Sequence, residues 1–122
     1  MTSALTWYQR RTYHHSAFPA QLLAEKRRRT ASVLLPARNE APTIGPIIAA
    51  LAPLREQGVI DQIAVLDDST DGTGDIAAGL GAEVYDQSSL RPEYGPVVGK
   101  GDAMWRGLSI ARGDVVCFLD AD

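Results

Sequence analysis

The chain of 122 residues is 45% hydrophobic and 22% charged, which suits one globular domain and excludes both a second domain and a disordered chain. No apolar run approaches the roughly 20 residues that span a membrane, and the polar N-terminus lacks the apolar segment of a signal peptide. The formal net charge of −3 is unevenly spread, because residues 1–29 hold six Lys or Arg and one Glu. We therefore expect a cytoplasmic protein without a membrane span.

Residues 1–30 are predicted to form a basic lead-in to a domain of residues 31–122. Leu22 and Leu23 indicate a short helix just before the basic residues 26–29. This stretch lacks interleaved aromatic residues, and no nucleic-acid-binding motif follows it. We interpret it as a solvated helix end or as local help in holding an anionic substrate, and we expect no nucleic-acid partner.

The first half of the domain alternates between strand and helix signals. Residues 32–35 form a short apolar run that ends at Pro36, which predicts a buried strand. Thr43 is a suitable N-cap for a helix whose apolar residues recur at i, i+3, i+4 and i+7, and Pro53 is expected to break that helix. Residues 63–66 then predict a second buried strand. Asp71 or Thr73 can cap the next helix, which is expected to reach Gly79.

The second half continues the alternation with a long loop inserted. Residues 83–85 predict a third strand, and the Gly- and Pro-rich residues 86–99 predict a loop. A helix over residues 101–111 is expected to bury Ala103, Met104 and Leu108. Residues 115–119 form the most apolar strand, which contains the chain's one cysteine, Cys117, predicted to be a buried thiol.

This order of elements predicts an α/β fold with a mostly parallel sheet and helices on both faces. Ligands of such sheets bind beyond the carboxyl ends of the strands. The polar residues follow this rule, because segments 38–40, 67–68 and 120–122 each follow a predicted strand. We therefore expect these three segments to share one site.

The site lacks the usual glycine-rich phosphate binders. Residues 36–40 contain no glycine, which excludes the dinucleotide fingerprint, and residues 95–101 have the wrong spacing for a P-loop. Carboxylates replace the glycines. Because carboxylates and phosphates repel each other, their combination at one site predicts a divalent cation between them.

Three segments together resemble the GT-A fold glycosyltransferases. They are Pro-Ala-Arg-Asn-Glu at 36–40, Leu-Asp-Asp-Ser-Thr-Asp-Gly-Thr at 66–73 and Phe-Leu-Asp-Ala-Asp at 118–122. Residues 11–19 and 99–106 narrow the resemblance to the glucosyl-3-phosphoglycerate synthases, which are retaining enzymes. The similarity runs from about Trp7 to Asp122 and corresponds to the N-terminal part of that family's catalytic domain, so the GT-A fold is expected to be incomplete.

The resemblance implies a role for each matching residue. The partners implied are a nucleotide-sugar donor, UDP-glucose or GDP-glucose, and 3-phosphoglycerate as acceptor, and the full-length form is expected to be a homodimer. Asp122, together with Asp120, is implied to bind Mg²⁺ or Mn²⁺. The residues implied to contact the donor are Pro36, Ala37, Glu40, Asp67, Ser69, Lys100, Asp120 and Ala121.

The sequence departs from the family at one turn. Many relatives have a glycine between the second acidic residue and Ser-Thr-Asp, whereas Asp68 is followed directly by Ser69. The turn is one residue shorter, which leaves open where these two side chains point.

The residues themselves support part of these roles. Asp120 and Asp122 are two apart, so on an extended chain they point to the same side. Lys100 lies between two glycines and is interpreted as a phosphate contact or as a solvated lysine. Trp105 is predicted to be a core residue, and Arg106 to meet an acidic acceptor or to form a surface ion pair.

No nucleophile can be assigned, and two alternatives stay open. Besides a retaining synthase of the kind that the resemblance implies, the chain could be part of an inverting family 2-like glycosyltransferase or a non-catalytic nucleotide-binding module. Because the resemblance covers only the front of the catalytic domain, we expect these 122 residues alone to be inactive or nearly so, and prone to aggregation.

Overall fold

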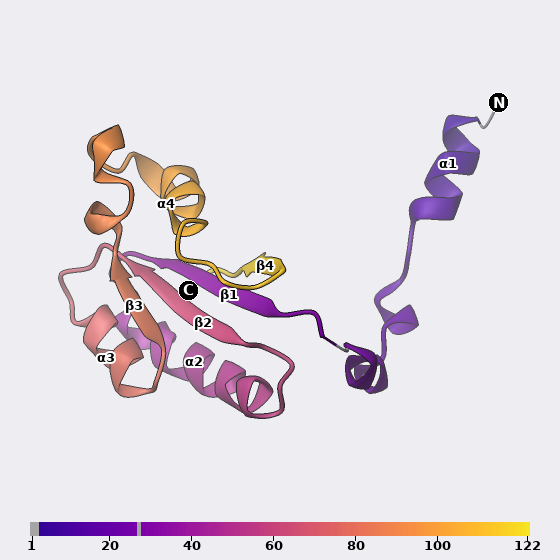
Figure 1. The fold of residues 1–122 in the computed structure, drawn as a ribbon, viewed down its shortest axis with the longest axis horizontal. Helices are drawn as coiled ribbons and strands as arrows, with labels where there is room; N and C mark the ends of the chain where they lie inside the picture. Colours follow the sequence, from indigo (N-terminus) through magenta and orange to yellow (C-terminus); the bar gives the residue numbers. More distant parts are fainter. Residues whose placement is uncertain (1–2, 27) are drawn as a thin grey trace.

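A computed structural model describes residues 3–26 and 28–122. Its centre is a four-stranded sheet in which all neighbouring strands run parallel (Figure 1). The strand order is β3-β2-β1-β4. The strands are β1 (Ala31–Ala37), β2 (Gln62–Asp67), β3 (Glu83–Asp86) and β4 (Val115–Phe118). The predicted α/β fold with a parallel sheet is confirmed.

The two inner strands, β1 and β2, are buried on both faces because helices cover the sheet from both sides. Val33 and Leu35 pack with α2 (Ala41–Glu56) and α3 (Thr73–Gly79), while Leu34 and Leu66 belong to the core on the opposite face. On that face lies α4 (Gly99–Gly107), which approaches so closely that a Cβ at Gly107 would lie 2.4 Å from Leu66 Cδ1. Each strand therefore reads as a continuous apolar run.

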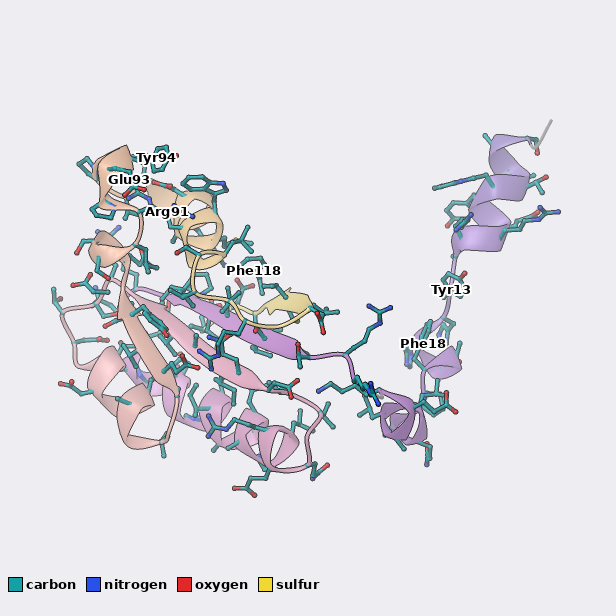
Figure 2. The ribbon with its side chains drawn as sticks, in the orientation of Figure 1. Tyr13, Phe18, Arg91, Glu93, Tyr94 and Phe118 are labelled. Atoms are coloured by element: carbon teal, nitrogen blue, oxygen red, sulfur yellow. The ribbon has the colours of Figure 1, made fainter. Side chains whose placement is uncertain are left out.

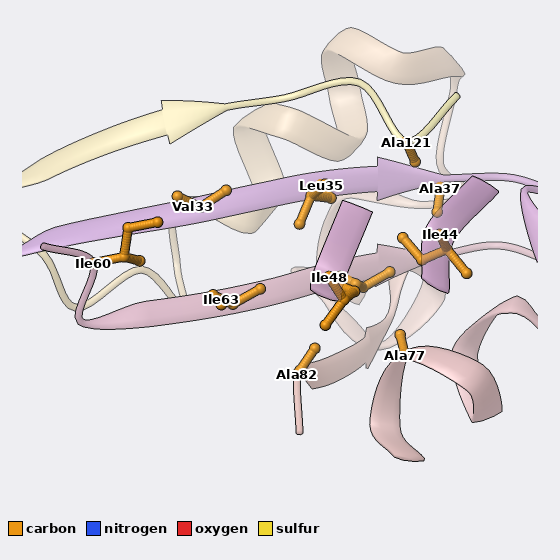
Figure 3. Close-up of a cluster of buried hydrophobic side chains, with 11 residues drawn as sticks. Val33, Leu35, Ala37, Ile44, Ile48, Ile60, Ile63, Ala77, Ala82 and Ala121 are labelled. Atoms are coloured by element: carbon orange, nitrogen blue, oxygen red, sulfur yellow. The ribbon is translucent and has the colours of Figure 1, made fainter. Parts of the chain in front are cut away.

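The core between the sheet and the helices α2 and α3 extends to the carboxyl ends of the strands. Ile44 and Ile48 of α2 are fully buried there (Figure 3). Ala37, at the end of β1, and Ala121, beyond β4, close the top of the cluster and are 2% and 3% exposed. The floor of the site described below is thus part of the hydrophobic core.

The structure corrects two predictions about α2. The helix begins at Ala41 with Glu40 as its N-cap, so Thr43 is not the cap, and it continues through Pro53 to Glu56. Pro46 and Pro53 are seven residues apart, and both lie on the exposed face of the helix. Because the carbonyl groups that lose their partners there face water, the helix is not broken.

The helix α4 and the strand β4 also differ from expectation. The helix ends at Gly107, and Leu108 is exposed rather than buried. Trp105 is 50% exposed and packs edge-to-face on Tyr94, so it is not a core residue. Cys117 is exposed because β4 is the edge strand of the sheet.

The predicted loop of residues 86–99 holds two short 3₁₀ turns, η3 (Gln87–Ser89) and η4 (Pro92–Tyr94). Arg106 of α4 holds this loop and is 2% exposed, so its ion pair with Asp102 is buried and not the predicted surface pair. Its guanidinium donates to Asp102 Oδ1 at 3.0 Å and to three main-chain oxygens, those of Leu90, Arg91 and Pro96. Figure 2 shows Arg91, Glu93 and Tyr94 gathered above α4.

The lead-in extends away from the sheet (Figure 1). It holds α1 (Ala4–Arg11), η1 (His15–Ala17) and η2 (Ala20–Glu25), and none of the residues in these three elements is buried. The short helix predicted at Leu22 and Leu23 is therefore the 3₁₀ helix η2. Tyr13 and Phe18 meet edge-to-face, with ring centroids 5.8 Å apart (Figure 2).

Lys26 fastens the lead-in to the domain. Its ammonium donates to Gly58 O at 2.7 Å and to Asp61 Oδ2 at 2.6 Å. Arg27, one of the predicted basic residues, lies outside the described residues. None of the helices within residues 3–26 and 28–122 is long and apolar enough to cross a bilayer.

Candidate nucleotide-sugar site

A cavity of about 220 Å³ lies at the carboxyl ends of the strands. It is lined by residues at or beyond the ends of all four strands and by the start of α4. The lining residues are Pro36, Ala37, Arg38, Glu40, Asp68, Gln87, Val97, Gly99, Lys100, Ala121 and Asp122. The three polar segments that the sequence placed at strand ends thus meet around one cavity.

Hydrogen bonds between two loops set the shape of this edge. Asn39 adopts a left-handed conformation with φ of 56°, which is unusual for a residue other than glycine. Its amide donates to Ser69 Oγ at 2.8 Å, and its side-chain Oδ1 accepts from the amide of Thr70 at 2.9 Å. The loop after β1 is therefore fastened to the loop after β2.

The first turn of α2 is held by the same second loop. The amide of Ala41 donates to Asp71 Oδ2 at 3.1 Å, and the amide of Glu40 donates to Thr73 Oγ1 at 3.0 Å. A hydrogen bond from the Thr73 hydroxyl is the main cause that lowers the pKa of Asp71 below its usual value. Asp71 and Thr73 therefore cap α2 from another part of the chain.

The Asp-Ala-Asp segment is positioned by two main-chain contacts. The amide of Leu119 donates to Leu34 O at 3.1 Å, and the Thr43 hydroxyl donates to Ala121 O at 2.6 Å. Ala121 is buried in the core, while Asp120 and Asp122 on either side of it are exposed. The two carboxylates therefore face away from the core, as their spacing predicted.

Lys100 brings a positive charge to the cavity. It follows Gly99, whose φ of 77° suits glycine, and its ammonium forms an ion pair with Asp120. The hydrogen bond that it donates to Asp120 is the main cause that raises the pKa of Lys100, and the charges of Asp122 and Glu40 raise it further. Lys100 thus lies among the carboxylates, although both partners of the pair are exposed.

A divalent cation fits this set of donors. Asp122 has no hydrogen bond or ion pair with any described residue, so its carboxylate is free to bind a cation. Within residues 3–26 and 28–122, no group of three His, Cys, Asp or Glu side chains could hold a metal alone. Mg²⁺ commonly takes one or two carboxylates and completes its shell with phosphate oxygens and water. Asp122 and Asp120 supply that number.

Three predicted donor contacts do not line this cavity: Asp120, which pairs with Lys100, and Asp67 and Ser69. Asp67 and Ser69 line a neighbouring cavity of about 400 Å³ beside α3, together with Gly72 and Gly74. Successive side chains of β2 point to opposite faces of the sheet, so Asp67 turns towards α3 and Asp68 lines the first cavity. Of the three carboxylates expected to gather, Glu40 and Asp122 share a cavity and Asp67 does not. Whether Asp67 and Ser69 contact the donor stays a prediction.

Five lining residues had no role assigned from the sequence: Arg38, Asp68, Gln87, Val97 and Gly99. Arg38 and Asp68 face each other at the exposed rim, with Arg38 Nε 3.8 Å from Asp68 Oδ2. Gln87 is 7% exposed and follows β3 inside the predicted loop. The alternation of side chains along a strand could have predicted that Asp68 and Asp67 point to opposite faces of the sheet. No pattern in the sequence marks Gln87, because its place depends on the turn that η3 makes.

Comparison with known proteins decides the family. Residues 32–122 match the profile of glycosyl transferase family 2 over three quarters of the chain.

The chain belongs to glycosyl transferase family 2.

Within this family, the chain is 42% identical over 119 residues to a glucosyl-3-phosphoglycerate synthase of Mycolicibacterium paratuberculosis. It is 49% identical, with a TM-score of 0.89, to the crystal structure of mannosyl-3-phosphoglycerate synthase from Rubrobacter xylanophilus, and the match covers 98% of this chain. Glucosyl-3-phosphoglycerate synthase from Mycobacterium tuberculosis, solved with Mn²⁺, UDP-glucose and phosphoglyceric acid, is 43% identical over 91% of this chain, with a TM-score of 0.79. The sheet described above is therefore part of a GT-A fold, as predicted.

These relatives are much longer than the chain. It spans 36% of the mycobacterial synthase, 41% of the Rubrobacter structure and 40% of the tuberculosis structure. The family 2 chain thus corresponds to little more than a third of the proteins that it matches.

Proposed function

We propose that the chain binds UDP-glucose with Mg²⁺ or Mn²⁺ and belongs to a glucosyl-3-phosphoglycerate synthase that transfers the glucose to 3-phosphoglycerate with retention. The observation that carries this proposal is the cavity at the carboxyl ends of the parallel strands, which Lys100 and the free carboxylate of Asp122 both line. A related structure of the same fold contains Mn²⁺, UDP-glucose and phosphoglyceric acid.

The chain's residues divide the work of donor binding. Asp122 and Asp120 hold the cation, which stabilises the charge that develops on the departing diphosphate. Lys100 adds a positive charge beside the phosphates, for which it exchanges its present partner Asp120. Pro36 and Ala37 at the end of β1, and Glu40 after it, line the nucleoside part of the cavity.

Transfer breaks the bond between glucose and the diphosphate, forms a bond to the hydroxyl oxygen of 3-phosphoglycerate, and releases the hydroxyl proton together with the nucleoside diphosphate. No described residue beside the cavity stands out as a nucleophile, so none is assigned. The 122 residues make up little more than a third of the relatives' length, and we propose that they bind the donor without completing the transfer. We also propose that the whole enzyme is a cytoplasmic homodimer.

A second donor is favoured by one observation. The Rubrobacter structure, which has 49% identity and a TM-score of 0.89, is named a mannosyl-3-phosphoglycerate synthase. Titration of UDP-glucose, GDP-glucose and GDP-mannose into the same protein preparation separates the two possibilities. If GDP-mannose binds most tightly, the proposed reaction becomes transfer of mannose and not of glucose.

Calorimetric titration of UDP-glucose tests the metal site. The polypeptide should carry two additional glycines after Asp122, so that the terminal carboxylate does not itself bind the cation. We expect binding in Mn²⁺ that is lost in excess chelator. Asp122→Asn should weaken binding in Mn²⁺ about tenfold or more, because a ligand charge is removed from the cation.

Glu56→Gln provides the matched control, since it removes one carboxylate at the far end of α2. This variant should bind UDP-glucose as the unsubstituted chain does. Equal binding with Mn²⁺ and with chelator, or equal affinity of Asp122→Asn and the unsubstituted chain, would contradict the proposed metal site.

A further inference from the structure

Gln87 is a buried polar residue at the edge of the cavity that neither the motifs nor the proposed roles use. It opens η3 directly after β3, and the residue as a whole is 7% exposed. Its side-chain Nε2 donates to Leu66 O at 2.9 Å. A carbonyl oxygen can only accept a hydrogen bond, so this contact fixes which end of the amide is nitrogen.

The other end of the amide has no partner. Among the described side chains, Asp67 Oδ1 is the one fully enclosed nitrogen or oxygen atom without a hydrogen bond. Gln87 Oε1 also accepts no hydrogen bond from any described residue. Because it is not among the fully enclosed atoms, it must be in contact with open space. The open space that Gln87 borders is the cavity shared with Asp68, Lys100 and Asp122. The amide is therefore anchored by its nitrogen and presents its oxygen to the cavity.

The strand order places Gln87 at the nucleobase end. Asp122 follows β4 and Gln87 follows β3, the two outer strands, with β1 and β2 between them. Beyond β4 the chain returns towards β1, where Ala121 joins the core cluster of Ala37 and accepts a hydrogen bond from Thr43, so the width of β2 lies between Asp122 and Gln87. A nucleoside diphosphate with its phosphates near Asp122 and Lys100 therefore extends its base across the ends of β1 and β2 towards Gln87.

An anchored acceptor selects bases by their ring nitrogen. Uracil carries an N–H between its two carbonyl groups, whereas cytosine has a lone pair at the same position. Asp68 could also accept a hydrogen bond, but it is 58% exposed at the rim beside Arg38, and water competes there. Gln87 is buried, so an unmatched base would leave its oxygen opposite another acceptor.

We propose that Gln87 Oε1 accepts a hydrogen bond from the ring N–H of the donor's uracil and so selects UDP over CDP. The inference rests on the proposed function, because it places a nucleotide in the same cavity. It goes further in assigning base selection to a side chain that is held by the main chain of β2.

The test compares UDP with CDP by calorimetry, in Mn²⁺, on the unsubstituted chain, on Gln87→Met and on Gln57→Met. Methionine has nearly the shape of glutamine but no acceptor oxygen, and Gln57 is an exposed residue at the end of α2. We expect UDP to bind about tenfold more tightly than CDP to the unsubstituted chain and to Gln57→Met. In Gln87→Met this preference should fall to about twofold or less, mainly through weaker UDP binding.

The ratio of the two affinities is the decisive quantity, because both nucleotides are measured on the same protein and a partly unfolded fraction cancels. An unchanged preference for UDP in Gln87→Met would overturn the assignment of Gln87 and leave the proposed function intact. If the unsubstituted chain binds neither nucleotide, the proposed function fails, and the assignment of Gln87 fails with it.

Discussion

Arg106 holds the loop that forms one wall of the cavity. Its side chain is 2% exposed and bonds to Asp102 and to the main-chain oxygens of Leu90, Arg91 and Pro96. These hydrogen bonds pair main-chain carbonyl groups of an irregular segment, which would otherwise have no partner next to the core. Arg106 thus acts on the site through Val97 and Gly99, which end this loop and line the cavity.

Arg106→Met should lower the free energy of unfolding by about 3 kcal/mol, because the buried carbonyl groups and Asp102 lose their partner. Arg106→Lys should lose less, since it keeps the charge but cannot bond in three directions. Urea denaturation followed by circular dichroism measures both. A loss of under about 0.5 kcal/mol in Arg106→Met, as for a surface position, would contradict the structural role.

The same variant changes the dependence of stability on pH. The hydrogen bond from Arg106 is the main cause that lowers the pKa of Asp102 below its usual 3.8. A lowered folded-state pKa contributes stability that is present above pH 3.8 and is lost as the pH falls through the folded value. The difference between the chain and Arg106→Met should therefore shrink in acid. An equal difference at pH 7 and pH 3 would count against this ion pair.

Individual residues were predicted well where a repeating pattern determines their side. The two-residue spacing of Asp120 and Asp122 was sufficient to place both carboxylates away from the core. Trp105 and Arg106 were predicted the wrong way round, because the sequence does not show that a loop returns over α4 and accepts the guanidinium. Gln87 could not be found either, since its burial arises from contacts with β2.

At the scale of elements, α2 shows how a helix tolerates proline. Pro42 lies in the first turn, where its missing amide hydrogen has no partner to lose, while Pro53 lies near the other end of the helix. Both Pro46 and Pro53 are on the exposed face, so water takes the place of the lost main-chain partners. The sequence shows each proline but not the face on which it lies relative to solvent.

Pro53→Ala should raise the free energy of unfolding by about 1 kcal/mol or more, because alanine restores a main-chain hydrogen bond inside the helix. Pro42→Ala is the matched control and should change stability by only a few tenths of a kcal/mol. Thermal and urea unfolding of the two variants give the comparison. Equal effects of the two substitutions would mean that Pro53 does not strain the helix.

The order of strands and helices was predictable because buried parallel strands appear as unbroken apolar runs. Residues 32–35 and 63–66 lie within β1 and β2. Element ends were less certain, as in α4, where the apolar residues after Gly107 suggested a longer helix. The contacts between the loops after β1 and β2 join residues about 30 positions apart, so no local pattern predicts them.

At the scale of the molecule, the sheet has an open edge at β4. Its outer side has no strand partner among the described residues, and Val115 is 52% exposed. Edge strands with exposed apolar residues favour association between chains. Cys117 lies on this strand and offers a direct probe of its accessibility.

The thiol of Cys117 should react with Ellman's reagent in the folded 122-residue chain within about tenfold of the rate of a free thiol. Because the chain holds one cysteine, Cys117→Ser should abolish the signal and serves as the control. Reaction that occurs only after addition of urea would show that β4 is covered in solution, by a second copy or by the lead-in.

Side chains of the Ser-Thr-Asp-Gly-Thr run after β2 accept hydrogen bonds from main-chain amides of the loop after β1 and of the first turn of α2. Selection for correct folding would then preserve this run even in a descendant that had lost transferase activity. The side chains of Lys100 and Asp122 bond to no main-chain group of the described residues, so drift could remove them at little cost to folding. Because the proposed donor site depends on both side chains, these two positions, rather than the more conspicuous run, would separate working enzymes from inactive descendants in a survey of genomes.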